Sequence, residues 1–185
     1  MRITGGEFRG RNLKVPKSDA IRPTQDRVRE ALFNILAPEI AASSFLDLFA
    51  GSGAVGLEAL SRGAASAVFV EQSRRHLSVL EENLKLVYPS SRPPATVIAA
   101  DVYRWIATYS GEGFTIGFAD PPYALGEEKG YASVLKTLAD RNVIRPGGLF
   151  IAEMTSVQKA EDTPGWDILR DRVYGTTRLC VWRRL

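Results

Sequence analysis

The feature that most constrains the fold is a repeated alternation of short apolar runs with segments of helical periodicity. Residues of helical spacing separate the runs, and Ser73 stands where it can cap one such helix. Strands that alternate with helices form a parallel sheet with right-handed crossovers. The five apolar runs of strand length lie at 45–49, 67–70, 96–100, 114–119 and 149–152.

The tail of the chain breaks this alternation. Two further strand-like runs, 168–174 and 177–183, stand on either side of Gly175, and so short a connection implies an antiparallel pair. We therefore expect an open α/β sheet, mostly parallel, with one antiparallel strand near its edge. A helix is expected over 131–141, and the preceding 124–130 reads as a solvent loop or a lid.

Acidic residues stand at or near the ends of four successive predicted strands, and the first is followed by a glycine loop. In open α/β sheets, ligands bind beyond the carboxyl ends of the strands. Gly51, Gly53 and Gly56 also match the dinucleotide pattern G-x-G-x-x-G, and Glu71 follows at the distance of a ribose-binding acid. An oxidoreductase that uses a nicotinamide or flavin cofactor is therefore a rival reading.

The full set of strand ends favours S-adenosylmethionine over a dinucleotide, because Asp47 would oppose a pyrophosphate just before the loop. Asp47 is expected to orient the loop and face the cationic amino-acid end of the cofactor. The loop residues Gly51, Ser52 and Gly53 would let the backbone approach it closely. Glu71 would accept from the ribose hydroxyls, and Asp101 from the adenine amino group.

The fourth strand ends in the motif Asp120-Pro121-Pro122-Tyr123, which carries the expected chemistry. Each proline fixes its φ, so the segment is stiff. An exocyclic amine of a base is a poor nucleophile because its lone pair is delocalised into the ring. The Asp120 carboxylate and the Pro121 carbonyl can accept its two N–H hydrogens, and Tyr123 can stack on the base. A plain strand-to-loop turn is the alternative.

The basic start of the chain suggests contact with a polyanion. Residues 1–30 carry eight basic and four acidic side chains, whereas the whole chain has a net charge of only +3. We expect a basic segment 1–23, followed by a methyltransferase domain 24–185, although a solvated arm is the alternative. The residues expected to contact phosphates are Arg9, Arg11, Lys14, Lys17 and Arg22.

Composition limits the remaining classes. A single cysteine, Cys180, permits no internal disulfide, and the only histidine is His76, so we expect no His/Cys metal site. No signal peptide and no membrane-spanning run is apparent. These features suggest a cytoplasmic protein.

Several segments together resemble the RsmD family of bacterial 16S rRNA guanine-N2 methyltransferases over nearly the whole chain. They are 2–6 with 9–11 near the start, 22–34 as the most specific run, 47–53, 120–123 and 174–179. The resemblance implies a Rossmann-like class I methyltransferase fold with a seven-stranded sheet and S-adenosyl-L-methionine as cofactor. It also implies transfer to the N2 amine of the guanine conventionally numbered 966 in 16S rRNA, within a small-subunit particle.

Two other function classes stay open on the residues alone. The Asp-Pro-Pro-Tyr motif also occurs in adenine-N6 methyltransferases that act on DNA or RNA, so the motif does not choose the base. A nucleic-acid-binding protein that kept the fold without activity is the third class. We expect a monomer with no membrane association.

Overall fold

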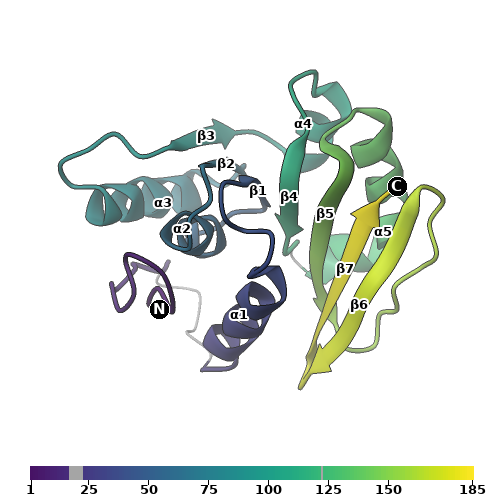
Figure 1. The fold of residues 1–185 in the computed structure, drawn as a ribbon, viewed down its shortest axis with the longest axis horizontal. Coiled ribbons are helices and arrows are strands. Elements are labelled where there is room, and N and C mark those ends of the chain that lie inside the picture. Colours follow the sequence, from purple (N-terminus) through teal and green to yellow (C-terminus); the bar gives the residue numbers. More distant parts are fainter. Residues whose placement is uncertain (17–22, 122) are drawn as a thin grey trace. The chain divides into compact units, whose positions relative to one another are not determined.

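The computed structural model describes residues 1–16, 23–121 and 123–185, without the side chains of 23–25 and 123–130. The chain divides into two compact units, Met1–Ala100 and Asp101–Leu185. Figure 1 labels the helices and strands of both. The described residues contain seven strands, three in the first unit and four in the second.

The first unit is a three-stranded parallel sheet with helices between its strands. β2 lies in the middle and pairs in parallel with β1 and with β3. Apolar side chains of β1 and β2 form the buried core, and α2 packs against both strands. Its elements are α1 (Pro23–Leu36), β1 (Ser44–Leu48), α2 (Ala54–Ser61), β2 (Ser66–Glu71), α3 (Arg74–Val87) and β3 (Ala95–Ala99).

The second unit is a mixed four-stranded sheet. β4 pairs in parallel with β5, whereas β7 runs antiparallel to β5 on one side and to β6 on the other. β6 and β7 are the long yellow strands of Figure 1. Its elements are α4 (Val102–Thr108), β4 (Phe114–Ala119), α5 (Tyr123–Asp140), β5 (Ile144–Thr155), β6 (Trp166–Tyr174) and β7 (Thr177–Arg184).

The expected alternation and the terminal hairpin are both confirmed. The strand predicted over 114–119 coincides with β4. Each of the other predicted strands overlaps closely with its observed counterpart, except at β5. Gly175 stands at the hairpin turn with φ of 62°, a left-handed backbone that glycine adopts without strain. Ser73 caps α3, because its side chain accepts from the His76 N–H.

Two boundaries were wrong. The segment 124–130, read as a loop, is helical, since α5 begins at Tyr123 rather than at Tyr131. Gly126 and Gly130 lower helix propensity by about 1 kcal/mol each relative to alanine, and tertiary context overrides that local preference here. β5 begins at Ile144, not Leu149, because a register irregularity opposite 114–116 accommodates Pro146 and Gly147 within the strand.

Candidate active site

The turn between β1 and α2 carries the glycine loop of the first unit. Asp47 is almost fully buried, and its Oδ2 accepts from the Gly56 N–H at 2.9 Å. Gly53 stands before α2 with φ of 78°, and a Cβ at Gly56 would lie 2.3 Å from the Phe69 ring. The expected orienting role of Asp47 thus has a concrete form: the carboxylate ties the end of β1 to the first turn of α2.

Glu71, at the end of β2, holds the same loop from the other side. Its Oε2 accepts from the Gly51 N–H at 2.9 Å, and its Oε1 accepts from the Ser73 N–H at 2.7 Å. The side chain is only 6% exposed. Each carboxylate oxygen has two lone pairs, so each can still accept one further hydrogen bond. Glu71 is therefore held in place by the backbone and keeps acceptor capacity.

Asn83 is a positioning residue that the sequence reading missed. This fully buried amide on α3 donates to the Ser52 carbonyl at 2.9 Å and to the Lys14 carbonyl at 3.0 Å. Its Oδ1 accepts from the Lys14 N–H at 2.8 Å. The signal was an asparagine on the apolar face formed by Leu80, Leu84 and Val87. Asn83 thereby ties the glycine loop to the N-terminal segment.

The N-terminal segment is packed onto the first unit rather than free of it. Glu58 of α2 is fully buried, and its carboxylate accepts from both the N–H and the hydroxyl of Thr4, at 2.8 and 2.7 Å. Arg62 also donates to Glu58, at 2.8 Å. The domain boundary at residue 23 stays a prediction, but residues 1–16 belong structurally to this unit.

The five cations expected to contact RNA fall into three groups. Arg11 donates to the Leu86 and Val87 carbonyls at the end of α3, and Lys14 pairs with Glu82 at 2.6 Å, so both already serve the fold. Arg9 lies exposed in the turn that ends at Gly10. Lys17 and Arg22 lie outside the described residues. RNA contact by all five stays a prediction.

Asp101 opens the second unit as the cap of α4. Its Oδ1 accepts from the Arg104 N–H at 2.8 Å, while the side chain remains exposed. A capping role accounts for one oxygen. Its expected contact with adenine stays a prediction.

A small pocket in the second unit gathers the residues most suited to chemistry. It is lined by Asp120, Pro121, Tyr131, Glu153, Met154, Thr155 and Gln158. Pro122 lies outside the described residues, as does the side chain of Tyr123, so the stacking role of Tyr123 stays a prediction. The pocket therefore contains the two predicted acceptors, together with a second carboxyl that the sequence reading had not selected.

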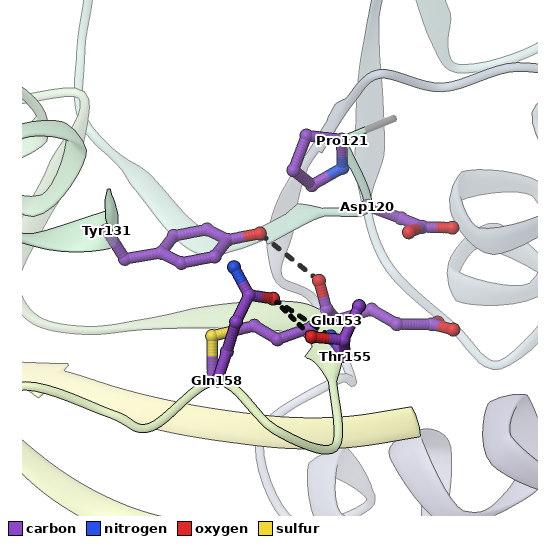
Figure 2. A pocket seen from close by; sticks show the side chains of 7 residues that line it. Asp120, Pro121, Tyr131, Glu153, Thr155 and Gln158 are labelled. Atoms are coloured by element: carbon purple, nitrogen blue, oxygen red, sulfur yellow. Dashed lines mark hydrogen bonds between the residues drawn. The ribbon is translucent and has the colours of Figure 1, made fainter. Parts of the chain in front are cut away.

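Strand pairing brings that second carboxyl beside Asp120. Ala119 on β4 is in register with Ala152 on β5, which puts Asp120 and Glu153 at the next position of two parallel strands. Residues in register on neighbouring strands point to the same face. Figure 2 shows both side chains extending in the same direction, with Tyr131 approaching from α5. The Tyr131 hydroxyl donates to the Glu153 main-chain carbonyl at 3.1 Å.

The pKa values of both carboxyls are raised, chiefly by burial. Protein packed around Asp120 displaces the water that would stabilise its charge and raises its pKa to about 6, although part of the side chain stays open to solvent. Burial and the Asp120 charge raise the pKa of Glu153 to about 8, against an opposing hydrogen bond from Thr177. Burial also raises the pKa of Tyr131, which therefore remains a donor.

Glu153 could have been found from the sequence. It directly follows the apolar run 149–152, just as the other selected acids stand at or near the ends of their runs. Two neighbouring details are visible only in the structure. The Gln158 side-chain oxygen accepts from the Thr155 N–H at 2.9 Å, and Thr177 on β7 reaches the Glu153 carboxyl.

Three further side chains serve packing: Trp166, Trp182 and Cys180 are buried in the second unit. Within the described residues, no group of three or more His, Cys, Asp or Glu side chains could hold a metal ion. None of the described helices has both the length and the apolar character needed to cross a membrane.

Comparison with known proteins identifies the family. The model described as Conserved hypothetical protein 95 matches residues 1–183. The chain belongs to this family, the RsmD family. It is 38% identical to Ribosomal RNA small subunit methyltransferase D of Escherichia coli (strain K12), covering all of this chain and 90% of that protein. It is 32% identical to Putative rRNA methyltransferase YlbH of Bacillus subtilis (strain 168), over 100% and 99%.

Solved structures confirm the fold class. The putative methyltransferase yhhF from Escherichia coli has a TM-score of 0.85 at 36% identity, covering 100% of this chain and 97% of that one. SMU.776, a putative methyltransferase complexed with SAH, has a TM-score of 0.69 at 17% identity, over 88% and 50%. The RsmD family chain therefore has the expected Rossmann-like class I methyltransferase fold.

Proposed function

We propose that this RsmD family protein transfers a methyl group from S-adenosylmethionine to the exocyclic N2 amine of a guanine in 16S rRNA. The observation that carries the proposal is the pocket in which Asp120 and Pro121 offer acceptors at the end of β4. The names of the full-length relatives support rRNA of the small subunit as the substrate. The guanine at position 966 is the target that the family resemblance implies.

The residues of the glycine loop fit the cofactor. Asp47 puts a buried carboxylate at the start of α2, which disfavours a pyrophosphate there and suits a cationic group. Glu71, fixed by two backbone N–H groups, would accept from the two ribose hydroxyls, with Gly51, Ser52 and Gly53 in close approach. Asp101 would accept from the adenine amino group with the oxygen that does not cap α4.

The acceptors of the second unit would raise the reactivity of the amine. When bound, S-adenosylmethionine supplies an electrophilic methyl group on a sulfonium centre. Asp120 and the Pro121 carbonyl would accept the two N–H hydrogens and favour a lone pair that is localised on the nitrogen instead of delocalised into the ring. As the N–C bond formed and the bond between the methyl group and sulfur broke, a neutral thioether would leave and positive charge would develop on the nitrogen. Asp120 would then accept the proton that leaves the nitrogen. A carboxylate with a pKa of about 6 can do this at neutral pH.

The cellular setting follows from the substrate. An enzyme that modifies 16S rRNA within a small-subunit particle works in the cytoplasm, and we expect it to act as a monomer. The exposed Arg9 and the other cations of the basic start, Arg11, Lys14, Lys17 and Arg22, would contact rRNA phosphates. Because Arg11 and Lys14 also bind their own chain, Arg9 is the better first test of this contact.

The test is methylation of small-subunit particles from cells that lack the modification, with isotope-labelled S-adenosylmethionine and mass mapping of the nucleoside. We expect labelled N2-methylguanosine at one position, with none from the Asp120→Ala variant. Labelled N6-methyladenosine would transfer the assignment to the adenine-specific class. If the wild-type enzyme binds the cofactor but no label appears in the RNA, the proposal of methyl transfer is contradicted.

A further inference from the structure

We propose that Glu153 selects the target base, by accepting a hydrogen bond from the ring N–H that adjoins the amine of guanine. This inference rests on the proposed function and assigns the choice of base to a residue outside the Asp-Pro-Pro-Tyr motif. The motif cannot make that choice, because it presents acceptors to an NH2 group and every amino-bearing base has one.

The geometry gives the pocket one acceptor more than an amine requires. Asp120 and the Pro121 carbonyl account for the two amine hydrogens, and Glu153 provides a further carboxylate from the adjacent strand, in register with Asp120. Both side chains extend in the same direction (Figure 2). A third acceptor beside the amine site calls for a base with a third hydrogen on the same edge.

Guanine is the amino-bearing base that meets this requirement. Its N1–H lies next to the N2 amine, so three hydrogens lie in a row on one edge. In adenine and cytosine the ring nitrogen beside the amine is an acceptor without a hydrogen, and its lone pair would face the Glu153 carboxylate. A site that hydrogen-bonds an N–H rejects analogues that lack it, because its own buried polar groups are then left unpaired.

Two contacts hold Glu153 in place, and the one from Thr177 favours the ionised, accepting form of its carboxyl. The Thr177 side chain on β7 is hydrogen-bonded to it, and Tyr131 holds the Glu153 main chain through the carbonyl. Thr177 itself is 9% exposed, so this support comes from the core of the sheet. The side chain that would read the base is therefore positioned by Tyr131 and Thr177, two residues that lie outside the motif.

The experiment compares guanine with 2-aminopurine at the mapped target position, in particles reconstituted from ligated rRNA. 2-Aminopurine keeps the amine at C2 but has no hydrogen on N1. We expect the wild-type enzyme to prefer guanine by about 10–100-fold in kcat/KM. Glu153→Gln should lower kcat/KM for guanine by a similar factor and leave 2-aminopurine unchanged or improved, since its amide can donate to N1.

Controls separate a failure of this inference from a failure of the proposed function. Glu161→Gln changes an exposed carboxylate of the same unit and should leave the preference intact. Cofactor affinity and melting temperature of both variants report on folding. A Glu153→Gln enzyme that keeps the wild-type preference, or a wild type that prefers 2-aminopurine, overturns the role of Glu153 while guanine methylation stands. A wild type that leaves guanine unmethylated removes the proposed function and this inference with it.

Discussion

Asp47 and Glu71 of the first unit are bound by backbone N–H groups, whereas Asp120 and Glu153 of the second unit extend in the same direction from neighbouring strands (Figure 2). Asp47 and Glu71 accept from Gly56, Gly51 and Ser73, so their charges are used to fix a loop. Asp120 and Glu153 adjoin on neighbouring strands, and the pKa of each is raised. Acidic residues near strand ends therefore serve two purposes: Asp47 and Glu71 shape a loop through backbone hydrogen bonds, and Asp120 and Glu153 place two carboxyls of raised pKa beside one pocket.

The sharpest test of this contrast is Asp120→Asn. Loss of the charge that stabilises the developing cation should lower kcat for methyl transfer by about 10²–10³-fold, the cost of removing one preorganised group from a polar site. Cofactor affinity, measured by calorimetry, should stay unchanged because the loop of the first unit is intact. Asp140→Asn, in an exposed pair with Lys136, is the matched control. If the Asp120→Asn variant loses cofactor affinity instead, Asp120 serves cofactor binding and the contrast with the loop carboxylates does not hold.

Glu71→Gln tests the opposite side of the comparison. The amide offers one acceptor where the carboxylate offers two, so either the Gly51 or the Ser73 N–H would lose its partner. An unpaired buried donor costs about 1–3 kcal/mol, which corresponds to a loss of about 5–150-fold in affinity for S-adenosylmethionine if the loop shifts to compensate. Glu81→Gln, an exposed change on α3, should have no effect. Unaltered calorimetric affinity in Glu71→Gln would show that the loop is held by other contacts.

A smaller effect is expected in the pH dependence of stability. A carboxyl whose pKa is raised on folding stabilises the protein fully below its unfolded pKa, and this stability is lost as pH rises through the folded value. For Glu153 that range runs from about 4 to about 8. Asp120, Tyr131 and Thr177 are the groups that face it, and Asp120 contributes in the same direction.

Glu153→Gln should therefore melt a few degrees above the wild type at pH 9, with the difference disappearing near pH 5. Thermal unfolding followed by circular dichroism at both pH values measures this. Glu161→Gln again provides the control. A lower melting temperature at pH 9 would mean that the ionised Glu153 is stabilised in the fold, contrary to the raised pKa.

The smallest effect concerns the first unit's contact with RNA. If Arg9 contacts a phosphate, Arg9→Ala should weaken binding of small-subunit particles a few-fold and reduce the slope of log affinity against log salt by about 1. Turnover of saturating substrate should stay unchanged, since the acceptors lie in the second unit. Arg170→Ala, an exposed cation of β6, serves as the comparison. An unchanged salt slope would remove Arg9 from the RNA-contacting set.

Local patterns were sufficient for much of the fold. Apolar runs bounded by turn residues located all seven strands, and the short connection at Gly175 gave the antiparallel pair. The prediction of a loop over 124–130 was wrong for a physical reason: helix propensity is weak where glycine occurs, and packing decides the outcome. The predicted start of β5 was wrong because a register irregularity depends on the neighbouring strand.

The sequence by itself determined the acidic residues near the strand ends, since period, breakers and charge are all local properties. Only the tertiary structure decided which polar groups become partners. Thr4 and Glu58 are 54 positions apart and Asn83 and Lys14 are 69 apart, and only folding brings their polar groups into contact. The same holds for Asp120 and Glu153, because strand register, which no single segment encodes, puts the two carboxyls side by side.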